Sequence, residues 1–294
     1  MRFPVKPRLS SLWRPARTAL DEPRPSARIQ TAQPRCLISD ARLGLERGEF
    51  FFVAQPILRL HEKRLSGFEY LMRWRHPDDG ILAPARFISL VEDSILARRF
   101  TELLIERAAD TLQRWQQSGH GDLSLAINLG AAELASADLP QRIQSIFAAR
   151  EILPGRLEIE LTGAVQPDRL DGLAEAMRAV QAIGAQVALD DLGGGYNSLT
   201  LLQQLPADIV KFDRSYLANV PADGEATRTI EMLVKFARGH GKQIVLSGVE
   251  THAQFAWAQS LQDVNVQGFY IDKPHDETRV GELINRYGNP STCF

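Results

Sequence analysis

The chain of 294 residues suits one large domain plus a tail, and 44% hydrophobic residues are enough for a sizeable core. Residues 1–35 hold eight Lys/Arg and two acidic residues, which gives this segment a charge of about +6 and leaves about −8 on the rest of the chain. The acidic remainder argues against a large nucleic-acid surface on the folded domain itself. Cys36 and Cys293 lack paired spacing, so we expect no disulfide framework. No apolar run reaches the ~18 residues that span a bilayer, and none forms a secretory signal. We therefore expect a cytoplasmic protein.

The N-terminal segment, residues 1–37, contains six prolines and shows no sustained hydrophobic periodicity. This composition predicts a basic, Pro/Arg-rich disordered tail. An electrostatic arm for a membrane surface or nucleic acid is the alternative, based on Trp13 close to Arg14 and Arg17. We place the folded domain at residues 38–288 and a short C-terminal tail at 289–294.

Eight short runs rich in apolar and β-branched residues follow the tail, and each predicts a strand. They are 50–59, 65–74, 123–128, 157–162, 186–191, 209–213, 243–249 and 264–271. Amphipathic stretches of helical period separate most of them, at 99–117, 167–183, 223–239 and 251–261. Gly119, Gly184 and Gly241 stand where three of these helices would end.

The connection between the first two strands, His61 to Arg64, is too short for a parallel crossover, which needs about a dozen residues. We therefore predict an antiparallel hairpin there. The remaining repeated βα units predict a parallel sheet, which is either a closed barrel or a doubly wound sheet. Periodicity alone leaves both open.

Polar residues stand at or near the ends of successive predicted strands. They are Glu69, Asn128, Glu160, Asp190, Asp191, Lys211, Asp213, Ser247, Glu250 and Gln267. In a closed barrel they would meet at the C-terminal rim, where barrel enzymes have their active sites. Oxygen ligands without His or Cys suit Mg²⁺ or Mn²⁺. A single buried carboxylate is equally well explained by helix capping or pairing with Arg, but the set at successive strand ends favours a cation site.

The same residues resemble the EAL family of cyclic-di-GMP phosphodiesterase domains over roughly residues 40–285. The motif that names the family appears here as Glu69-Tyr70-Leu71, with Arg73 shortly after it. The other matches, in order, are Gln55-Pro56-Ile57, Phe87-Ile88, Asn128-Leu129, Glu160-Leu161-Thr162, Asp190-Asp191-Leu192 with the segment to Leu199, Lys211-Phe212-Asp213, Gly248-Val249-Glu250-Thr251 and Gln267-Gly268-Phe269-Tyr270. So many ordered matches at family spacing are highly specific.

This resemblance implies a modified TIM (β/α)8 barrel with one antiparallel strand. It also implies two divalent cations, Mg²⁺ or Mn²⁺, that activate a water for attack on one phosphodiester of cyclic-di-GMP and give linear pGpG. Its implied ligands are Glu69, Asn128, Glu160 and Asp190 for the first cation and Asp191 for the second. The catalytic set that it implies is Lys211, which orients the water, and Glu250. The residues that it implies for substrate binding are Gln55, Arg73, Asp213 and Gln267.

The chain departs from the family pattern in four places. Where the family has Ala-Glu-Gly-Val-Glu, this chain has Leu246-Ser247-Gly248-Val249-Glu250, so Ser247 replaces the acid at the second cation. A neutral hydroxyl supplies no negative charge and is no base near neutral pH. Gly163 replaces a Glu, the loop 192–195 contains three adjacent glycines, and Ala54 replaces a common Tyr. We expect the first cation site to persist and the second to be lost. Removing one supporting group near a metal typically lowers metal affinity or activity ten- to hundredfold, and we expect the loss of the second site to lower activity by more than this.

Three functional hypotheses follow from these departures. The first is a stand-alone EAL regulator of virulence or motility gene expression with impaired or absent phosphodiesterase activity, which acts through cyclic-di-GMP or a protein partner and forms the homodimer typical of the family. The second is an active Mg²⁺- or Mn²⁺-dependent phosphodiesterase in which Glu250 or a water network substitutes for the missing acid. The third, DNA binding through the basic tail, is disfavoured and predicts an affinity that falls steeply with salt.

Overall fold

A computed structural model of the chain describes residues 37–92, 94–163, 165, 169–192 and 198–287. The chain divides into two units, Met1–Arg35 and Cys36–Phe294, and the described helices and strands belong to the second. The predicted tail up to residue 36, the Gly193–Gly195 loop and the C-terminal tail 289–294 lie outside the described residues. No helix within the described residues is long and apolar enough to cross a membrane.

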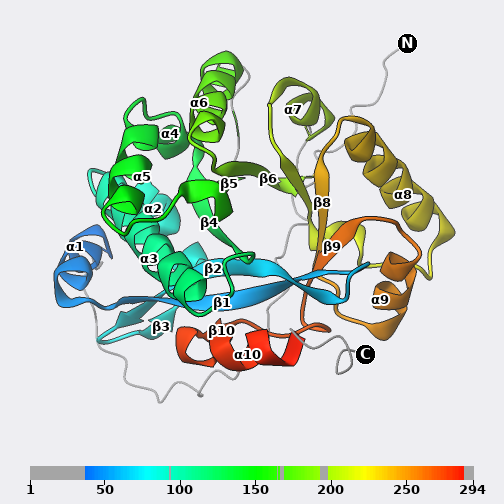
Figure 1. The fold of residues 1–294 in the computed structure, drawn as a ribbon, viewed down its shortest axis with the longest axis horizontal. Helices are drawn as coiled ribbons and strands as arrows, with labels where there is room; N and C mark the ends of the chain where they lie inside the picture. Colours follow the sequence, from blue (N-terminus) through cyan, green and yellow to red (C-terminus); the bar gives the residue numbers. More distant parts are fainter. Residues whose placement is uncertain (1–36, 93, 164, 166–168, 193–197, 288–294) are drawn as a thin grey trace, which may run out of the picture. The chain divides into compact units, whose positions relative to one another are not determined.

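Eight strands close into a barrel (Figure 1). They are β1 (Phe50–Arg59), β2 (Arg64–His76), β4 (Ser124–Gly130), β5 (Leu157–Thr162), β6 (Gln186–Leu192), β7 (Ile209–Phe212), β8 (Gln243–Ser247) and β9 (Val264–Gln267). β1 is antiparallel to both of its barrel neighbours, β2 and β9, and every other pairing around the barrel is parallel. The predicted hairpin and the modified barrel with one antiparallel strand are thereby confirmed.

Two short strands extend the sheet beyond the barrel. β3 (Gly80–Leu82) pairs with β2, and β10 (His275–Asp276) pairs with β1, both antiparallel. Runs of two or three residues are too short for a period to be recognised, so the sequence did not predict them. The predicted strands 243–249 and 264–271 were too long, because Gly248 and Gly268 adopt positive φ angles of 78° and 156° that end β8 and β9.

Helices surround the barrel on its outer side (Figure 1). They are α1 (Leu37–Arg47), α2 (Ile88–Glu92), α3 (Ala97–Gln117), α4 (Ala131–Leu134), α5 (Leu139–Ala148), α6 (Leu170–Ala182), α7 (Ser198–Gln204), α8 (Gly224–Gly239), α9 (His252–Gln259) and α10 (Val280–Tyr287). The four helices predicted from hydrophobic period correspond to α3, α6, α8 and α9. The other helices, α1, α2, α4, α5, α7 and α10, have four to eleven residues and were not among the examples that the hydrophobic period gave.

Helix α8 illustrates how sequence determines these elements. Asp223 caps its start by accepting hydrogen bonds from the backbone N–H groups of Glu225 and Ala226. Ile230, Val234 and Ala237, spaced four and three residues apart, form the buried face against the barrel.

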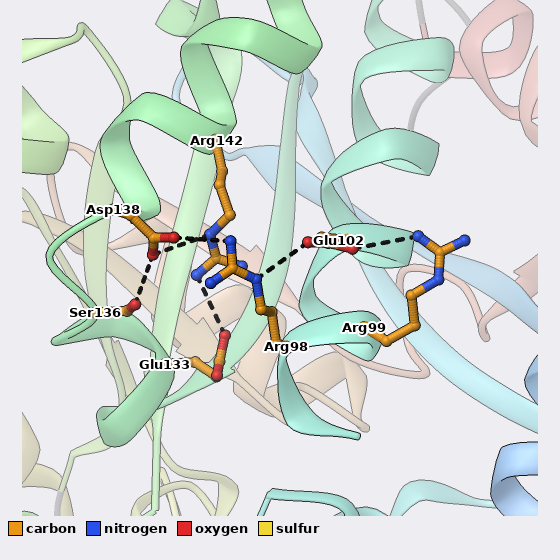
Figure 2. Close-up of polar contacts among 7 residues, drawn as sticks. All are labelled: Arg98, Arg99, Glu102, Glu133, Ser136, Asp138 and Arg142. Atoms are coloured by element: carbon orange, nitrogen blue, oxygen red, sulfur yellow. Dashed lines mark hydrogen bonds and ion pairs between the residues drawn. The ribbon is translucent and has the colours of Figure 1, made fainter. Parts of the chain in front are cut away.

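Charged side chains join the helices on one side of the barrel (Figure 2). Arg98 of α3 contacts Asp138, which precedes α5, at 2.8 Å. Arg142 of α5 donates to Glu133 of α4 at 3.5 Å and pairs with Asp138 at 3.3 Å. Arg98 is exposed and Asp138 is partly exposed, and such surface pairs contribute only about 0–1 kcal/mol each, whereas Arg142 and Glu133 are mostly buried. This network therefore helps to align α3, α4 and α5, whereas the apolar core supplies most of the stability.

Candidate functional site

A layer of polar side chains lies inside the barrel above a layer of apolar ones. Ile57, Ala188, Ile209 and Val245 form a buried apolar cluster of their own. Successive side chains of a strand point to opposite faces, so residues two positions away face the same interior. On β6, β7 and β8 these are Asp190, Lys211 and Ser247, and on the antiparallel β1 it is Gln55. Strand period therefore places the predicted residues at the C-terminal rim.

Lys211 is the centre of this polar layer. Its Nζ donates to Glu160 Oε1 and Oε2 at 2.6 and 2.7 Å and to Glu69 Oε2 at 2.9 Å, and it lies 3.8 Å from Asp190 Oδ1. Lys211 is 2% exposed and Glu160 is fully buried. Three carboxylates from β2, β5 and β6 thus converge on one ammonium group from β7.

Glu69 has two further partners. Asn128 Nδ2 of β4 donates to its Oε1 at 2.9 Å, and Gln267 Nε2 of β9 donates to its Oε2 at 2.8 Å. Asn128 lies directly opposite Glu160 in the parallel ladder, and Gln55 lies opposite Glu69 in the antiparallel one. Both carboxylate oxygens of Glu69 therefore accept hydrogen bonds, and these bonds fix the orientation of the carboxylate.

The ionisation of the acids reflects their crowding. Burial raises the pKa of Glu160 well above its usual range, and the Glu69 carboxylate adds to this effect, although Lys211 opposes it. Burial would also raise the pKa of Glu69, but Lys211, Asn128 and Gln267 together lower it. The carboxylates, Glu160 first, outweigh burial and raise the pKa of Lys211, so the ammonium stays charged.

Asp191 follows Asp190 at a distortion of β6. Its φ of +50° lies in the left-handed region, and the β6–β7 pairing breaks between Leu189 and Leu192. Such strain in a non-glycine residue is frequent at functional sites. Partial burial and the neighbouring Asp190 and Asp213 carboxylates raise the pKa of Asp191 to about 6.

An open cavity of about 410 Å³ lies above the polar layer. Of the predicted site residues, Gln55, Glu69, Asp190, Asp191, Lys211, Asp213, Ser247, Glu250 and Gln267 line it. Asn128 and Glu160 contact the lining residues Glu69 and Lys211 from below. Arg73 is not part of the lining, and its Nη1 donates to the Met72 carbonyl at 2.8 Å. The structure therefore brings all the predicted site residues except Arg73 to the cavity or to the layer directly beneath it.

Comparison with known proteins shows the family to which the chain belongs. Residues 38–274 match the family described as the EAL domain. The chain belongs to the EAL domain family. A Pseudomonas aeruginosa relative, the bifunctional diguanylate cyclase/cyclic di-GMP phosphodiesterase MucR, is 30% identical over 238 residues, which cover 81% of this chain and 35% of MucR. This chain thus spans about a third of the length of that curated relative.

Solved EAL domains have the same fold. A structure of the PaMucR phosphodiesterase in complex with c-di-GMP has a TM-score of 0.77 at 29% identity and covers 83% of this chain and 99% of that chain. The FimX EAL domain of Pseudomonas aeruginosa, bound to c-di-GMP, has a TM-score of 0.74 at 19% identity, with coverages of 82% and 97%. The second similarity supports the fold alone.

The donor set of the EAL domain fits a divalent cation at its first site. Glu69, Glu160 and Asp190 supply carboxylates and Asn128 an amide oxygen, all hard ligands of the type that Mg²⁺ and Mn²⁺ prefer. Lys211 balances only part of this negative charge. Within the described ranges, however, no three His, Cys, Asp or Glu side chains form a ready-made cation site. Ser247, where the resemblance to the family implies an acid for a second cation, supplies no carboxylate.

Ser247 ends β8 opposite Gln267. Its Oγ is buried and has no hydrogen-bond partner among the described residues, although the residue lines the cavity of the EAL domain. A buried hydroxyl without a partner is unfavourable, so a water or a bound group at the cavity would complete its hydrogen bonding.

Four lining residues were not among the predicted site residues, namely Arg214, Gly248, Gly268 and Phe269, although the last three lie in the motifs that resemble the family. They come just after the ends of β7, β8 and β9, where strand period no longer predicts orientation. A Cβ on Gly248 would lie 2.2 Å from Arg214 Cβ. Gly248 therefore lets the loops after β7 and β8 approach, a spatial requirement that explains why a glycine stands at this position of the motif.

Proposed function

We propose that this EAL domain binds cyclic-di-GMP in the rim cavity and acts as a regulator with impaired or absent phosphodiesterase activity. The observation that carries the proposal is Ser247, a neutral residue that lines the cavity where the resemblance to the family implies an acid. The regulatory output, on virulence or motility genes, would pass through a protein partner or a second copy of the chain. Binding and cleavage would thus be separated.

The cavity lining suits a cyclic dinucleotide. Its volume of about 410 Å³ lies within the range of small-molecule sites. Arg214 offers a guanidinium that pairs well with phosphate, and Phe269, 39% exposed, offers a ring face on which a base stacks. Gln55 and Gln267 supply amide donors and acceptors for base edges.

A cation has a defined place in this proposal. Glu69, Asn128, Glu160 and Asp190 would hold Mg²⁺ or Mn²⁺, which when bound supplies a Lewis acid and a water of lowered pKa. The chain's own residues orient this set, because Gln267 and Asn128 fix the Glu69 carboxylate by hydrogen bonds. Ser247 adds no charge for a second cation.

Calorimetric titration and a hydrolysis assay test the proposal together. We expect the wild-type protein to bind cyclic-di-GMP in the presence of Ca²⁺, which suppresses turnover, and to form pGpG slowly with Mg²⁺ or Mn²⁺. Ser247→Glu should raise the rate at least about tenfold, whereas Ser247→Ala, which adds no charge, should leave it unchanged. Absence of nucleotide binding, or rapid hydrolysis by the wild type, would overturn the proposal.

An active phosphodiesterase is the second candidate, and the position of Glu250 favours it. This carboxylate lines the same cavity three residues after Ser247. If Glu250 provides the missing charge, the wild type hydrolyses cyclic-di-GMP rapidly and Glu250→Gln abolishes the activity. Slow hydrolysis that is unaffected by Glu250→Gln argues against this candidate.

A further inference from the structure

A second open cavity, which we call the lower cavity, lies at the end of the barrel opposite the rim. Arg59, Gln243 and Asn265 line it, which places it where β1 ends and where β8 and β9 begin. Its volume of about 370 Å³ lies within the range of small-molecule sites. None of the predicted site residues belongs to its lining.

An apolar layer separates the lower cavity from the rim cavity. On β8, Gln243 lines the lower cavity and Ser247 lines the rim cavity, with Val245 of the buried apolar cluster between them. Residues four positions apart on a strand are about 13 Å apart. The two cavities are therefore distinct sites at opposite ends of the same strands.

Two cations of the lower cavity are held by partners that carry no net charge. Arg238, in the last turn of α8, donates to the backbone carbonyl of Gln262, and Lys242 Nζ donates to that of Ala207 at 2.6 Å. Among the described residues, neither cation forms an ion pair with a carboxylate. A carbonyl oxygen fixes the position of a cation but does not neutralise it, so both positive charges remain available.

The other charges of the lining leave this positive excess in place. Arg59 pairs with Glu62 at 3.0 Å, and Arg64 pairs with the same carboxylate, so two guanidinium groups share Glu62. Asp263, the second acidic residue of the lining, is exposed and opposes the two available cations with a single negative charge. The lower cavity is thus positive on a folded part that is acidic overall.

The chemistry of this lining fits a phosphate group. Arginine and lysine donors form charge-assisted hydrogen bonds with phosphate oxygens. The side-chain amides of Gln243 and Asn265 lie in the same lining and supply further donors. The volume admits a small molecule, whereas the acidic remainder of the fold repels an extended polyanion such as a nucleic acid.

We propose that the lower cavity is a second binding site of this EAL domain, for a small molecule that bears a phosphate group. Arg238 and Lys242 provide the charge that holds the phosphate. The site goes beyond the proposed function and does not depend on what the rim cavity binds.

Calorimetric titration with inorganic phosphate tests the inference, in EDTA and at an ionic strength kept constant with chloride. The double variant Arg238→Gln/Lys242→Gln removes both charges, while each Gln amide can still donate to a backbone carbonyl. We expect it to bind phosphate at least about tenfold more weakly than the wild type. Arg228→Gln, the same charge change on the exposed surface of α8, should leave the affinity unchanged. Absence of saturable phosphate binding by the wild type, or an equal loss in both variants, would overturn the inference.

A variant expected to gain affinity covers the case in which the double variant does not fold. Asp263 has a φ of +48°, a conformation that Asn also tolerates, so Asp263→Asn should preserve the fold. It removes the negative charge that opposes a bound phosphate and should raise the affinity at least about twofold. An unchanged affinity of Asp263→Asn would overturn the inference.

The rim cavity is the competing location for phosphate, because Arg214 lines it. Arg214→Gln should leave phosphate affinity unchanged if the lower cavity holds the ion. A loss of affinity in Arg214→Gln that the double variant does not share would place the phosphate at the rim and refute the inference.

Discussion

Ala54 and Tyr70 lie directly opposite each other in the β1–β2 ladder, both fully buried on the outer face of the barrel. The resemblance to the family implies Tyr at the first position and, from the Glu-Ala-Leu motif that names the family, Ala at the second, so this chain carries the implied pair exchanged. Opposite residues in a ladder have Cβ atoms about 4.5–5.5 Å apart and share one layer of the core. The departure at Ala54 is therefore compensated by Tyr70 and does not bear on the cavity.

The exchanged pair predicts strong coupling in a double-mutant cycle. Tyr70 stacks on Phe52 at 5.3 Å and bonds Thr111 Oγ1 at 2.7 Å, so Tyr70→Ala should lower the free energy of unfolding by about 3–5 kcal/mol. Ala54→Tyr alone should overpack the layer and lower the free energy of unfolding by about 1–3 kcal/mol. In urea denaturation, the variant that carries both changes should lose about 1–3 kcal/mol less free energy of unfolding than the sum of the losses of the two single variants. Strict additivity would show that the two positions do not share space.

Gly268 is predicted to be intolerant of any side chain. A Cβ there would lie 2.2 and 2.3 Å from the backbone O and N of Val249, and the φ of +156° is unfavourable for L-residues. Gly268→Ala should destabilise the fold by about 2–4 kcal/mol and weaken cyclic-di-GMP binding, because it separates the loops after β8 and β9. Gly172→Ala, in α6 with nothing within 4 Å, should stabilise by up to about 1 kcal/mol. Equal unfolding midpoints for the two variants would contradict this difference.

Gly163 is predicted to be a poor position at which to restore the family's Glu. Its φ is +84°, and its surroundings are open. Gly163→Glu should therefore lower the free energy of unfolding by about 1 kcal/mol and should not raise hydrolysis. The assay is pGpG formation by Ser247→Glu with and without the second change. A further large increase from Gly163→Glu would show that the segment after β5 rearranges.

Asp191 should make stability fall as pH rises. Its pKa of about 6 exceeds the ordinary value of 3.8, so the folded protein retains this proton between these values while the unfolded chain releases it. The free energy of unfolding consequently decreases through this window, and Asp191→Asn should remove that part of the decrease. In EDTA, the variant should gain in thermal midpoint over the wild type from pH 4 to pH 7. Glu175→Gln, on the exposed face of α6, is the control. A difference in thermal midpoint between Asp191→Asn and the wild type that does not change with pH would contradict the raised pKa of Asp191.

Local patterns were sufficient for most of the barrel. The four-residue connection from His61 to Arg64 required an antiparallel hairpin, and alternation brought Asp190, Lys211 and Ser247 to one rim. The meeting of Lys211, Glu69 and Glu160 at the rim was predicted, but their direct hydrogen bonds were not, because these depend on distances between residues up to 142 positions apart. Arg214 and Phe269 were missed for the related reason that loop backbones, not strand period, direct them.

The reversed direction of β1 shapes the mouth of the cavity. β2 pairs with β4 only as far as Glu69, yet it continues beside β1 up to the pair of Trp74 and Phe50. Beyond this point β1 and β2 continue as an antiparallel ribbon flanked by β10 and β3, while the loops after β7, β8 and β9 contribute Arg214, Gly248 and Phe269 to the cavity lining. Changes in what the cavity accepts can therefore fall on the loop residues Arg214 and Phe269 without touching the β1–β2 ladder.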